Sequence, residues 1–138
     1  TDMTIVGLGN STLDDDLSAV LAEQGRTVVP DPEPEKGFFY RSDHFPFARA
    51  GVPALYTDYG TVFVGKPPGF SQQIRDDYNQ NRYHQPSDEF DATWDFSGAQ
   101  LDFEALLQVA LRVAAADTWP TWREGNEFKA TRDAMLGR

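Results

Sequence analysis

The fold is decided by residues 4–29, which read TIVGLGNSTLDDDLSAVLAEQGRTVV. The run from Thr4 to Leu8 is short and apolar and ends at Gly-Asn, a pattern that indicates a buried strand. A second strand is predicted from Thr27 to Val29, because the proline-rich residues 30–34 then end it. A helix lies between the two, so this stretch is a strand–helix–strand unit, typical of a parallel sheet.

The helix between these strands has recognisable ends in the sequence. Ser11 is a plausible N-cap, and three aspartates at positions 14–16 occupy the first turn, where the helix dipole favours acidic side chains. Gly25 is a natural C-terminal stop. The apolar residues recur at helical spacing and are Leu13, Leu17, Val20 and Leu21. We expect this apolar face to pack against the strands.

Further elements are predicted along the rest of the chain. They are a helix from Ser42 or Asp43 to Gly51, a core strand from Pro53 to Thr57, a helix that ends before Pro120, and a short helix from about Asn126 to Leu136. A long loop from Tyr59 to about Arg82 contains a possible helical turn near residues 71–78. The helix before Pro120 has one apolar face, expected in the core, formed by Phe103, Leu107, Ala110, Leu111 and Ala114.

Alternating strands and helices predict an α/β protein with a mixed, largely parallel sheet flanked by helices. Only about three strands can be counted. Strands that are apolar on both faces need helices above and below the sheet and further strands on each side. The sequence therefore indicates part of a larger sheet. An unpaired apolar strand such as Thr4 to Leu8 tends to recruit another chain, so self-association is expected.

Composition excludes several classes of function. The hydrophobic share of 40% indicates a globular chain, and the net charge of −10 argues against nucleic acid and anionic lipid as partners. No apolar run approaches the length of a membrane span. Because there is no cysteine, any metal must be held by His, Asp or Glu. The chain has two histidines, His44 and His84, so each requires an explanation.

The first polar segment is Arg41-Ser42-Asp43-His44. Adjacent Ser, Asp and His residues cannot form a nucleophilic triad, because a triad needs side chains that converge from separate elements. Two interpretations stay open. In one, Ser42 or Asp43 caps a helix while His44 and Phe47 pack inward. In the other, the helix N-terminus lines a pocket and offers polar groups to a charged substrate.

The second polar segment is residues 81–89, NRYHQPSDE, at the end of the long loop. His84 is a candidate metal ligand, since imidazole is the usual nitrogen donor to zinc. The phenol of Tyr83 could donate a hydrogen bond to an oxyanion formed at that metal. Asp88 could orient the imidazole or simply cap the turn. The alternative is a surface loop in which Tyr83 and His84 only pack.

Both segments resemble motifs of the M28 metallopeptidases. Residues 38–55, FFYRSDHFPFARAGVPAL, are similar to a helix-and-strand signature of that family, and residues 81–88 are similar to its late metal-ligand motif. The two occur in the expected order with a loop of suitable length between them. Residues 5–37 and 94–136 also resemble the C-terminal part of one bacterial branch, so the similarity covers essentially the whole chain.

The resemblance implies a zinc-dependent aminopeptidase that uses metal-activated water to hydrolyse N-terminal peptide bonds of peptide substrates. The complete enzyme would hold two zinc ions, with His84 as one ligand and Tyr83 as the catalytic donor to the tetrahedral intermediate. Ser42 would line the substrate site, and the main-chain carbonyl of Arg41 would help hold the substrate α-amino group. The resemblance also implies that residues 1–138 are the C-terminal portion of a single catalytic domain, truncated on its N-terminal side, in a secreted or periplasmic enzyme.

The sequence departs from the family pattern in one respect. The other ligands of the family are a His-x-Asp pair, one glutamate of a Glu-Glu pair and a further aspartate, and the first glutamate of the pair is the general base. This sequence contains neither His-x-Asp nor Glu-Glu. Because a catalytic zinc normally has three protein ligands, we expect little or no zinc in the isolated chain and no activity.

Two other functions are compatible with the same fold. One is a noncatalytic binding or structural module, because a fold does not fix a function. The other is a glutaminyl cyclase-like enzyme, which shares a segment similar to residues 43–47. Such cyclases typically have a tryptophan before the late histidine, so Tyr83 favours the peptidase.

Overall fold

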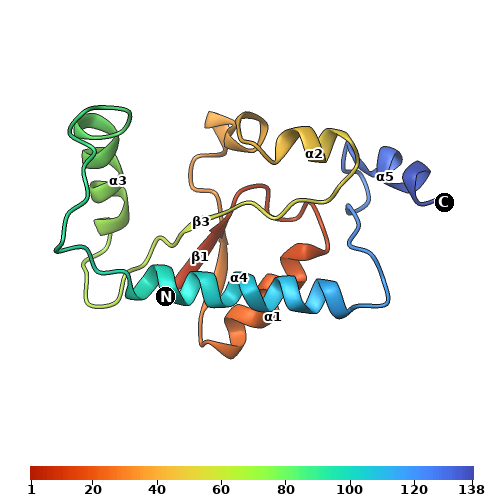
Figure 1. The fold of residues 1–138 in the computed structure, drawn as a ribbon, viewed down its shortest axis with the longest axis horizontal. Coiled ribbons are helices and arrows are strands. Elements are labelled where there is room, and N and C mark those ends of the chain that lie inside the picture. The colour runs from red at the N-terminus through yellow and green to blue at the C-terminus, as the bar shows by residue number, and fades with distance from the viewer.

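A computed structural model describes all residues, 1–138, and centres on a three-stranded sheet in the order β2-β1-β3 (Figure 1). Strand β1 (Asp2–Ile5) is central, β2 (Thr27–Pro30) pairs with it in parallel, and β3 (Thr57–Tyr59) pairs with it antiparallel. The α/β class is confirmed. The sheet is mixed, and the expected parallel arrangement holds for one of its two pairings.

The predicted strand–helix–strand unit is present, with helix α1 (Leu13–Glu23) between β1 and β2. The first strand ends at Ile5 rather than Leu8, because Gly7 and Gly9 have φ values of +85° and +95° and turn the chain. Ser11 does not cap α1 as predicted. The N-cap position is Thr12, and the hydroxyl of Ser11 accepts a hydrogen bond from the amide of Leu13 at 3.3 Å.

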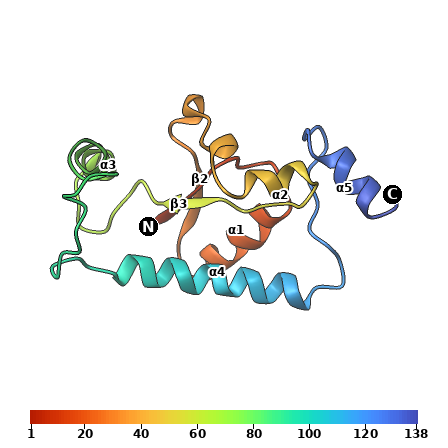
Figure 2. The same ribbon diagram turned by 45° about the horizontal axis from the view of Figure 1, so that its top comes forward.

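Two apolar clusters lie on opposite faces of the sheet (Figure 2). On one face, α1 and α4 (Ser97–Ala115) pack on β1 through Met3, Ile5, Leu17, Val20, Leu21, Ala105 and Val109. On the other, the cluster is Val6, Phe39, Ala48, Trp122 and Phe128. This cluster joins the 3-10 helix η2 (Phe38–Arg41), which follows the short 3-10 helix η1 (Pro34–Lys36), to helix α2 (Phe45–Arg49) and to the segment before α5 (Lys129–Met135).

The middle of the chain differs from the sequence prediction. Helix α2 is shorter than expected, and its N-cap is His44, with no side-chain capping bond from Ser42 or Asp43. The strand predicted from Pro53 to Thr57 is displaced along the chain, because only its last residue, Thr57, belongs to β3. The segment before it is joined to the end of the central strand by a hydrogen bond from the amide of Val6 to the carbonyl of Tyr56 at 2.9 Å. The long loop contains a full helix, α3 (Phe70–Asn81), where only a turn was predicted.

Helix α4 has the predicted apolar periodicity but buries the opposite face. Phe103, Leu107 and Leu111 are 72%, 57% and 53% exposed, while Ala105 and Val109 are in the core. The expectation that the first face lies in the core was therefore wrong. None of the helices combines the length and apolar character needed to cross a bilayer.

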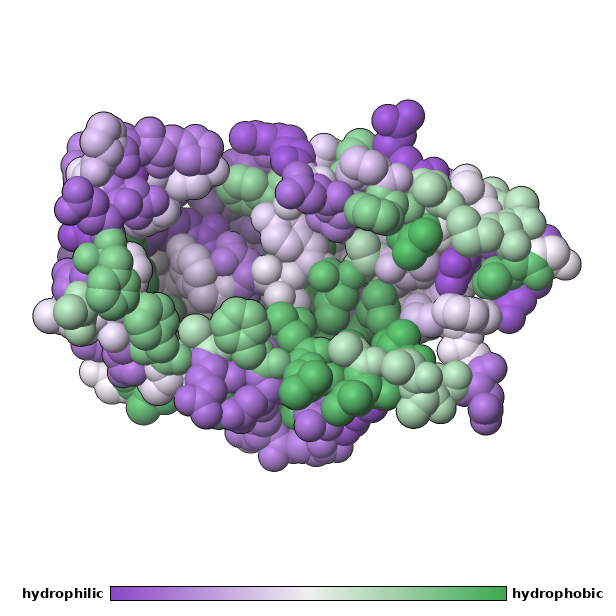
Figure 3. Space-filling view, in the orientation of Figure 1, coloured by the Kyte–Doolittle hydropathy of each residue, from purple (hydrophilic) through white to green (hydrophobic).

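The prediction that the strand from Thr4 to Leu8 is unpaired, on which the expected self-association rested, was also wrong. Strand β1 has a neighbour on each side, so it is not the unpaired edge that the sequence suggested. The apolar surface left open belongs to α4 instead (Figure 3).

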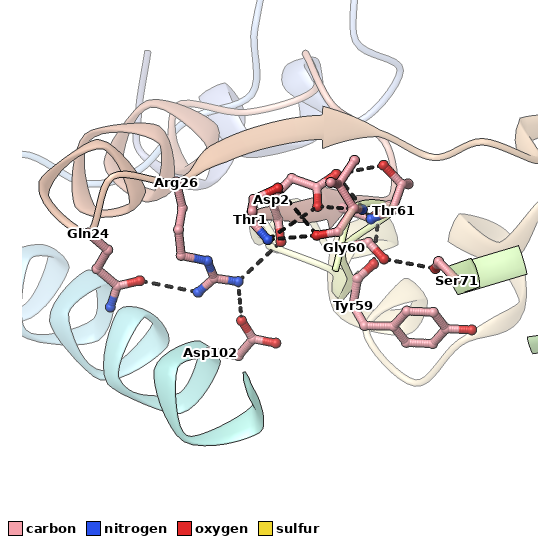
Figure 4. A network of polar contacts seen from close by, with 11 residues as sticks. Thr1, Asp2, Gln24, Arg26, Tyr59, Gly60, Thr61, Ser71 and Asp102 are labelled. Carbon is pink, nitrogen blue, oxygen red and sulfur yellow. Dashed lines mark hydrogen bonds and ion pairs between the residues drawn. The ribbon is translucent and has the colours of Figure 1, made fainter. Parts of the chain in front are cut away.

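The N-terminal end of β1 is tied to the rest of the fold by a buried carboxylate (Figure 4). Asp2 is only 4% exposed and accepts hydrogen bonds from the amide and hydroxyl of Thr61, at 3.0 and 2.6 Å, and from the amide of Val62 at 2.9 Å. Burial alone would raise the pKa of Asp2, but these hydrogen bonds outweigh it and hold the pKa below its ordinary value. A side chain at Gly60 would collide with the Asp2 oxygens.

The same end of β1 is connected to α4. The guanidinium of Arg26 donates to the carbonyl of Asp2 at 3.1 Å and forms an ion pair with Asp102 (Figure 4). Asp2 therefore links β1 to the loop after β3, and its carbonyl links β1 to the start of α4.

We predict that Asp2→Asn lowers the free energy of unfolding by roughly 1.5–3 kcal/mol, because the amide replaces a charged acceptor facing three donors. The difference from the parent should shrink as the pH falls below about 4, because the unfolded chain binds a proton at Asp2 there, whereas the folded carboxylate, with its lowered pKa, stays ionised until a lower pH. Urea denaturation at several pH values measures both effects. Asp117→Asn, at an exposed carboxylate, is the control, and equal losses in the two variants would contradict the prediction.

Candidate functional site

The segment with Arg41 and Ser42 lies between η2 and α2. Arg41 is exposed and donates a hydrogen bond to the carbonyl of Lys36 at 3.2 Å. Ser42 is extended, with φ −119° and ψ 164°, and its carbonyl accepts from the amide of Phe45 at 3.0 Å. The side chain of Ser42 therefore does not cap α2. The hydrogen bond from Phe45 holds the main chain of Ser42 at the start of the helix.

His44 is held by aromatic neighbours rather than by polar ones. Its ring centroid lies 4.6 Å from that of Phe39 and 4.9 Å from that of Tyr56. Its Nε2 atom is buried without a hydrogen-bond partner, and burial lowers the pKa of His44. The inward packing proposed for His44 is confirmed, whereas Phe47 points outward and is exposed.

Tyr83 and His84 lie in a tight turn directly after α3. The amides of Arg82 and Tyr83 both donate to the carbonyl of Tyr78 at 2.9 Å, which closes the end of the helix. The two rings stack with centroids 3.9 Å apart. Tyr83 is 51% exposed and His84 is exposed as well. Both side chains are therefore accessible to a ligand.

The backbone of His84 is strained. It is the one residue other than glycine with a positive φ, at +58°. A side chain in this left-handed region costs of order 1 kcal/mol and persists where the surroundings determine it. Here the hydroxyl of Ser87 donates to the carbonyl of Asn81 at 2.6 Å, and the hydroxyl of Tyr78 donates to Asp88 at 2.8 Å. Asp88 thus holds the turn by bonding Tyr78, and this hydrogen bond raises the pKa of Tyr78.

Helix α3 is itself anchored by Arg75, a residue that sequence reasoning missed. Its Nε donates to the hydroxyl of Tyr59 at 2.7 Å, and its guanidinium pairs with Asp58 at 3.1 Å and with Glu33 at 3.6 Å. Ser71 adds a hydrogen bond to the carbonyl of Gly60 at 2.9 Å. The available signal was a lone arginine within residues 71–78, where a helical turn was predicted, one turn before Tyr78.

These contacts form a continuous connection from the sheet to the candidate ligand. Tyr59 of β3 binds Arg75, Arg75 positions α3, and Tyr78 at the end of α3 holds the turn that carries Tyr83 and His84. The position of the imidazole therefore depends on how α3 is attached to β3.

The two predicted site segments are not in contact. Helix α3 and the turn after it lie at one end of the molecule in both ribbon views, away from α2 and the segment with Arg41 and Ser42 (Figures 1 and 2). The surface between α3 and the sheet is hollowed (Figure 3). The structure therefore does not bring the two segments together in one cleft.

The residues of this chain do not by themselves fit a zinc ion. No group of three or more His, Asp or Glu side chains comes together in a way that could hold a metal. His84 contributes one accessible imidazole, and a catalytic zinc normally needs three protein ligands.

We predict that Arg75→Gln raises amide hydrogen exchange across residues 71–84 by about tenfold or more, because a charge-assisted anchor worth roughly 1.5–3 kcal/mol is lost. Arg75→Lys should restore only part of the protection, since lysine lacks the planar fork. The control Arg49→Gln, on α2, should leave α3 unchanged. Unaltered exchange of α3 in Arg75→Gln would refute its role as anchor.

A second prediction concerns the buried imidazole. Because the pKa of His44 is lowered in the folded chain, the unfolded chain binds more protons below about pH 6.5, and stability should fall as the pH drops through that range. His44→Phe should flatten this dependence between pH 7.5 and 5.5, measured from urea midpoints. His84→Asn serves as the matched control and should keep it. A parent protein whose stability does not change over this range would disprove the prediction.

Comparison with known proteins identifies the family. The model of peptidase family M28 matches residues 1–108, which include both polar segments. Searches of curated proteins and of solved structures found no significant match. The match covers well over half of the chain. The chain belongs to peptidase family M28.

Proposed function

We propose that this chain is the C-terminal portion of the catalytic domain of a zinc-dependent aminopeptidase, in a secreted or periplasmic enzyme. The observation that carries the proposal is the family match over residues 1–108, which spans the segment with Arg41 and Ser42 and the turn with Tyr83 and His84. The family accounts for a peptidase, and the two segments suggest the metal ligand and the substrate site.

The turn after α3 is suited to the role proposed for it. The positive φ of His84 and the Tyr78–Asp88 hydrogen bond fix the main chain, so the imidazole is presented at a defined place. A positioned ligand costs less ordering when the metal binds. We propose His84 as one ligand of the two-zinc centre, with the remaining ligands and the general base supplied by parts of the enzyme other than these 138 residues.

Tyr83 is proposed as the donor to the reacting carbonyl oxygen. Its phenol O–H would donate a hydrogen bond to the oxyanion, an effect that reaches a few kcal/mol when the donor is preorganised. Stacking on His84 at 3.9 Å keeps the phenol beside the proposed ligand. The donor and the metal ligand would therefore be placed together by one turn.

The substrate is proposed to be a peptide with a free amino end. The main-chain carbonyl of Arg41 would accept a hydrogen bond from the protonated α-amino group, and Ser42 would line the same site. The net charge of −10 favours approach of a positively charged group. The 138 residues alone are proposed to be inactive, since they offer one accessible imidazole and contain neither a His-x-Asp nor a Glu-Glu pair.

The test compares two variants of the complete enzyme. Tyr83→Phe should lower kcat on aminoacyl anilides about 10²–10³-fold with unchanged zinc content, because only the oxyanion donor is lost. His84→Ala should lose zinc, measured by metal analysis after dialysis. His44→Phe, which keeps an aromatic ring at the inward-packed histidine, is the control for zinc content and should retain the metal. Equal zinc retention in His84→Ala and the parent would remove His84 from the ligand set.

The same assays separate the peptidase from a cyclase. Release of aniline from aminoacyl anilides, abolished by chelators, supports the aminopeptidase. Cyclisation of peptides that begin with glutamine, without anilide hydrolysis, would contradict it.

A further inference from the structure

The segment with Arg41 and Ser42 has an aromatic residue on each side of it. Phe39 is buried and precedes the segment, and Phe45 follows it as the first residue of α2. The amide of Phe45 donates to the carbonyl of Ser42, so the main chain of the segment runs between these two rings. A residue that holds both rings therefore also constrains the carbonyl groups of Arg41 and Ser42.

Phe128, from the segment before α5, packs against both rings. Its ring centroid lies 6.3 Å from that of Phe39, in a stacked arrangement, and 6.1 Å from that of Phe45, edge to face. Phe128 is buried, and both ribbon views place α2 and α5 at the same end of the molecule (Figures 1 and 2). Because a buried aromatic ring keeps one rotamer in a close-packed cluster, Phe128 fixes the separation of the two rings.

Glu127, the residue before Phe128, adds a polar contact to the same segment. The hydroxyl of Tyr40, which directly precedes Arg41, donates to Oε1 of Glu127 at 2.9 Å. This hydrogen bond raises the pKa of Tyr40. A hydrogen bond to a carboxylate is stronger than one between neutral groups. Glu127 and Phe128 therefore hold the chain immediately before Arg41 by two different kinds of contact.

The chain that carries residues 127–128 is itself fastened to the fold on both sides. Before them, the buried indole of Trp122 donates to the carbonyl of Gly51 at 3.1 Å, just after the C-terminal end of α2. After them, the backbone of α5 approaches the same glycine so closely that a Cβ at Gly51 would lie 2.9 Å from the amide nitrogen of Arg132. Residues 127–128 therefore contact the segment from a fixed support.

We propose that Glu127 and Phe128 are positioning residues for the substrate site, which orient the main-chain carbonyl of Arg41 toward the α-amino group of the peptide. Both residues lie beyond residues 1–108, the part of the chain that the family model matches. The inference rests on the proposed function, because it needs the role proposed for Arg41 and Ser42. It adds that residues after the matched region contribute to substrate binding.

Steady-state kinetics of the complete enzyme on aminoacyl anilides test the proposal. Glu127→Ala should raise KM about three- to tenfold with kcat and zinc content unchanged, because the bond to the α-amino group is made equally in the ground state and the transition state. Tyr40→Phe should have the same effect, and the double variant should add nothing, since both changes remove one contact. Glu127→Gln keeps an acceptor for the Tyr40 hydroxyl and should restore KM. Glu124→Ala, at an exposed carboxylate that pairs with Lys129, is the matched control. Parent-like KM values in Glu127→Ala and Tyr40→Phe would overturn the proposal.

Amide hydrogen exchange of the 138-residue chain supplies a readout that needs no activity. Phe128→Leu should raise exchange of the Phe45 amide about fivefold or more relative to the amides of α3, because the ring that holds Phe39 and Phe45 is lost. An equal rise in α3, or no change at Phe45, would refute the positioning role. If the complete enzyme does not hydrolyse aminoacyl anilides but Phe45 responds as expected, the proposed function fails while Phe128 still positions the segment.

Discussion

The carboxylate of Asp2 is buried at the end of the central strand, and three hydrogen-bond donors from the loop after β3 converge on it. The donors satisfy the charge, so burial is tolerated, and in return the loop is held against β1. Gly60 is required beside it because a larger residue would collide with its oxygens. These hydrogen bonds therefore fix the position at which the chain leaves the sheet after β3.

From the loop after β3, a series of contacts leads through α3 to the turn that carries Tyr83 and His84. Ser71 bonds the carbonyl of Gly60, and Arg75 clamps α3 to Tyr59, so the helix is attached at its first half. Its second half carries the turn in which His84 adopts a positive φ. Strain of this kind is tolerated where several contacts hold the chain, and such positions cluster at functional sites. The proposed ligand is thus accessible and has a defined main chain.

Some of this could be predicted from the sequence. The first strand–helix–strand unit is local, and its apolar spacing, acidic first turn and Gly25 stop all indicate one structure, which the fold confirms. Tyr83 and His84 were found because a short motif carries them. Arg75 was missed, since its partners Asp58, Tyr59 and Glu33 are separated from it along the chain and nothing local marks them.

Other features are set by tertiary packing. Helix α4 has apolar residues on two faces, and periodicity alone cannot tell which face the core accepts. The face with Ala105 and Val109 is the one that packs with α1, and the small side chain of Ala105 allows a close approach.

The proposed role of His84 is tested most directly by anomalous X-ray scattering at the zinc edge from crystals of the complete enzyme. We predict a zinc ion about 2.0–2.1 Å from a ring nitrogen of His84. A catalytic zinc whose ligands do not include this imidazole would contradict the proposed role.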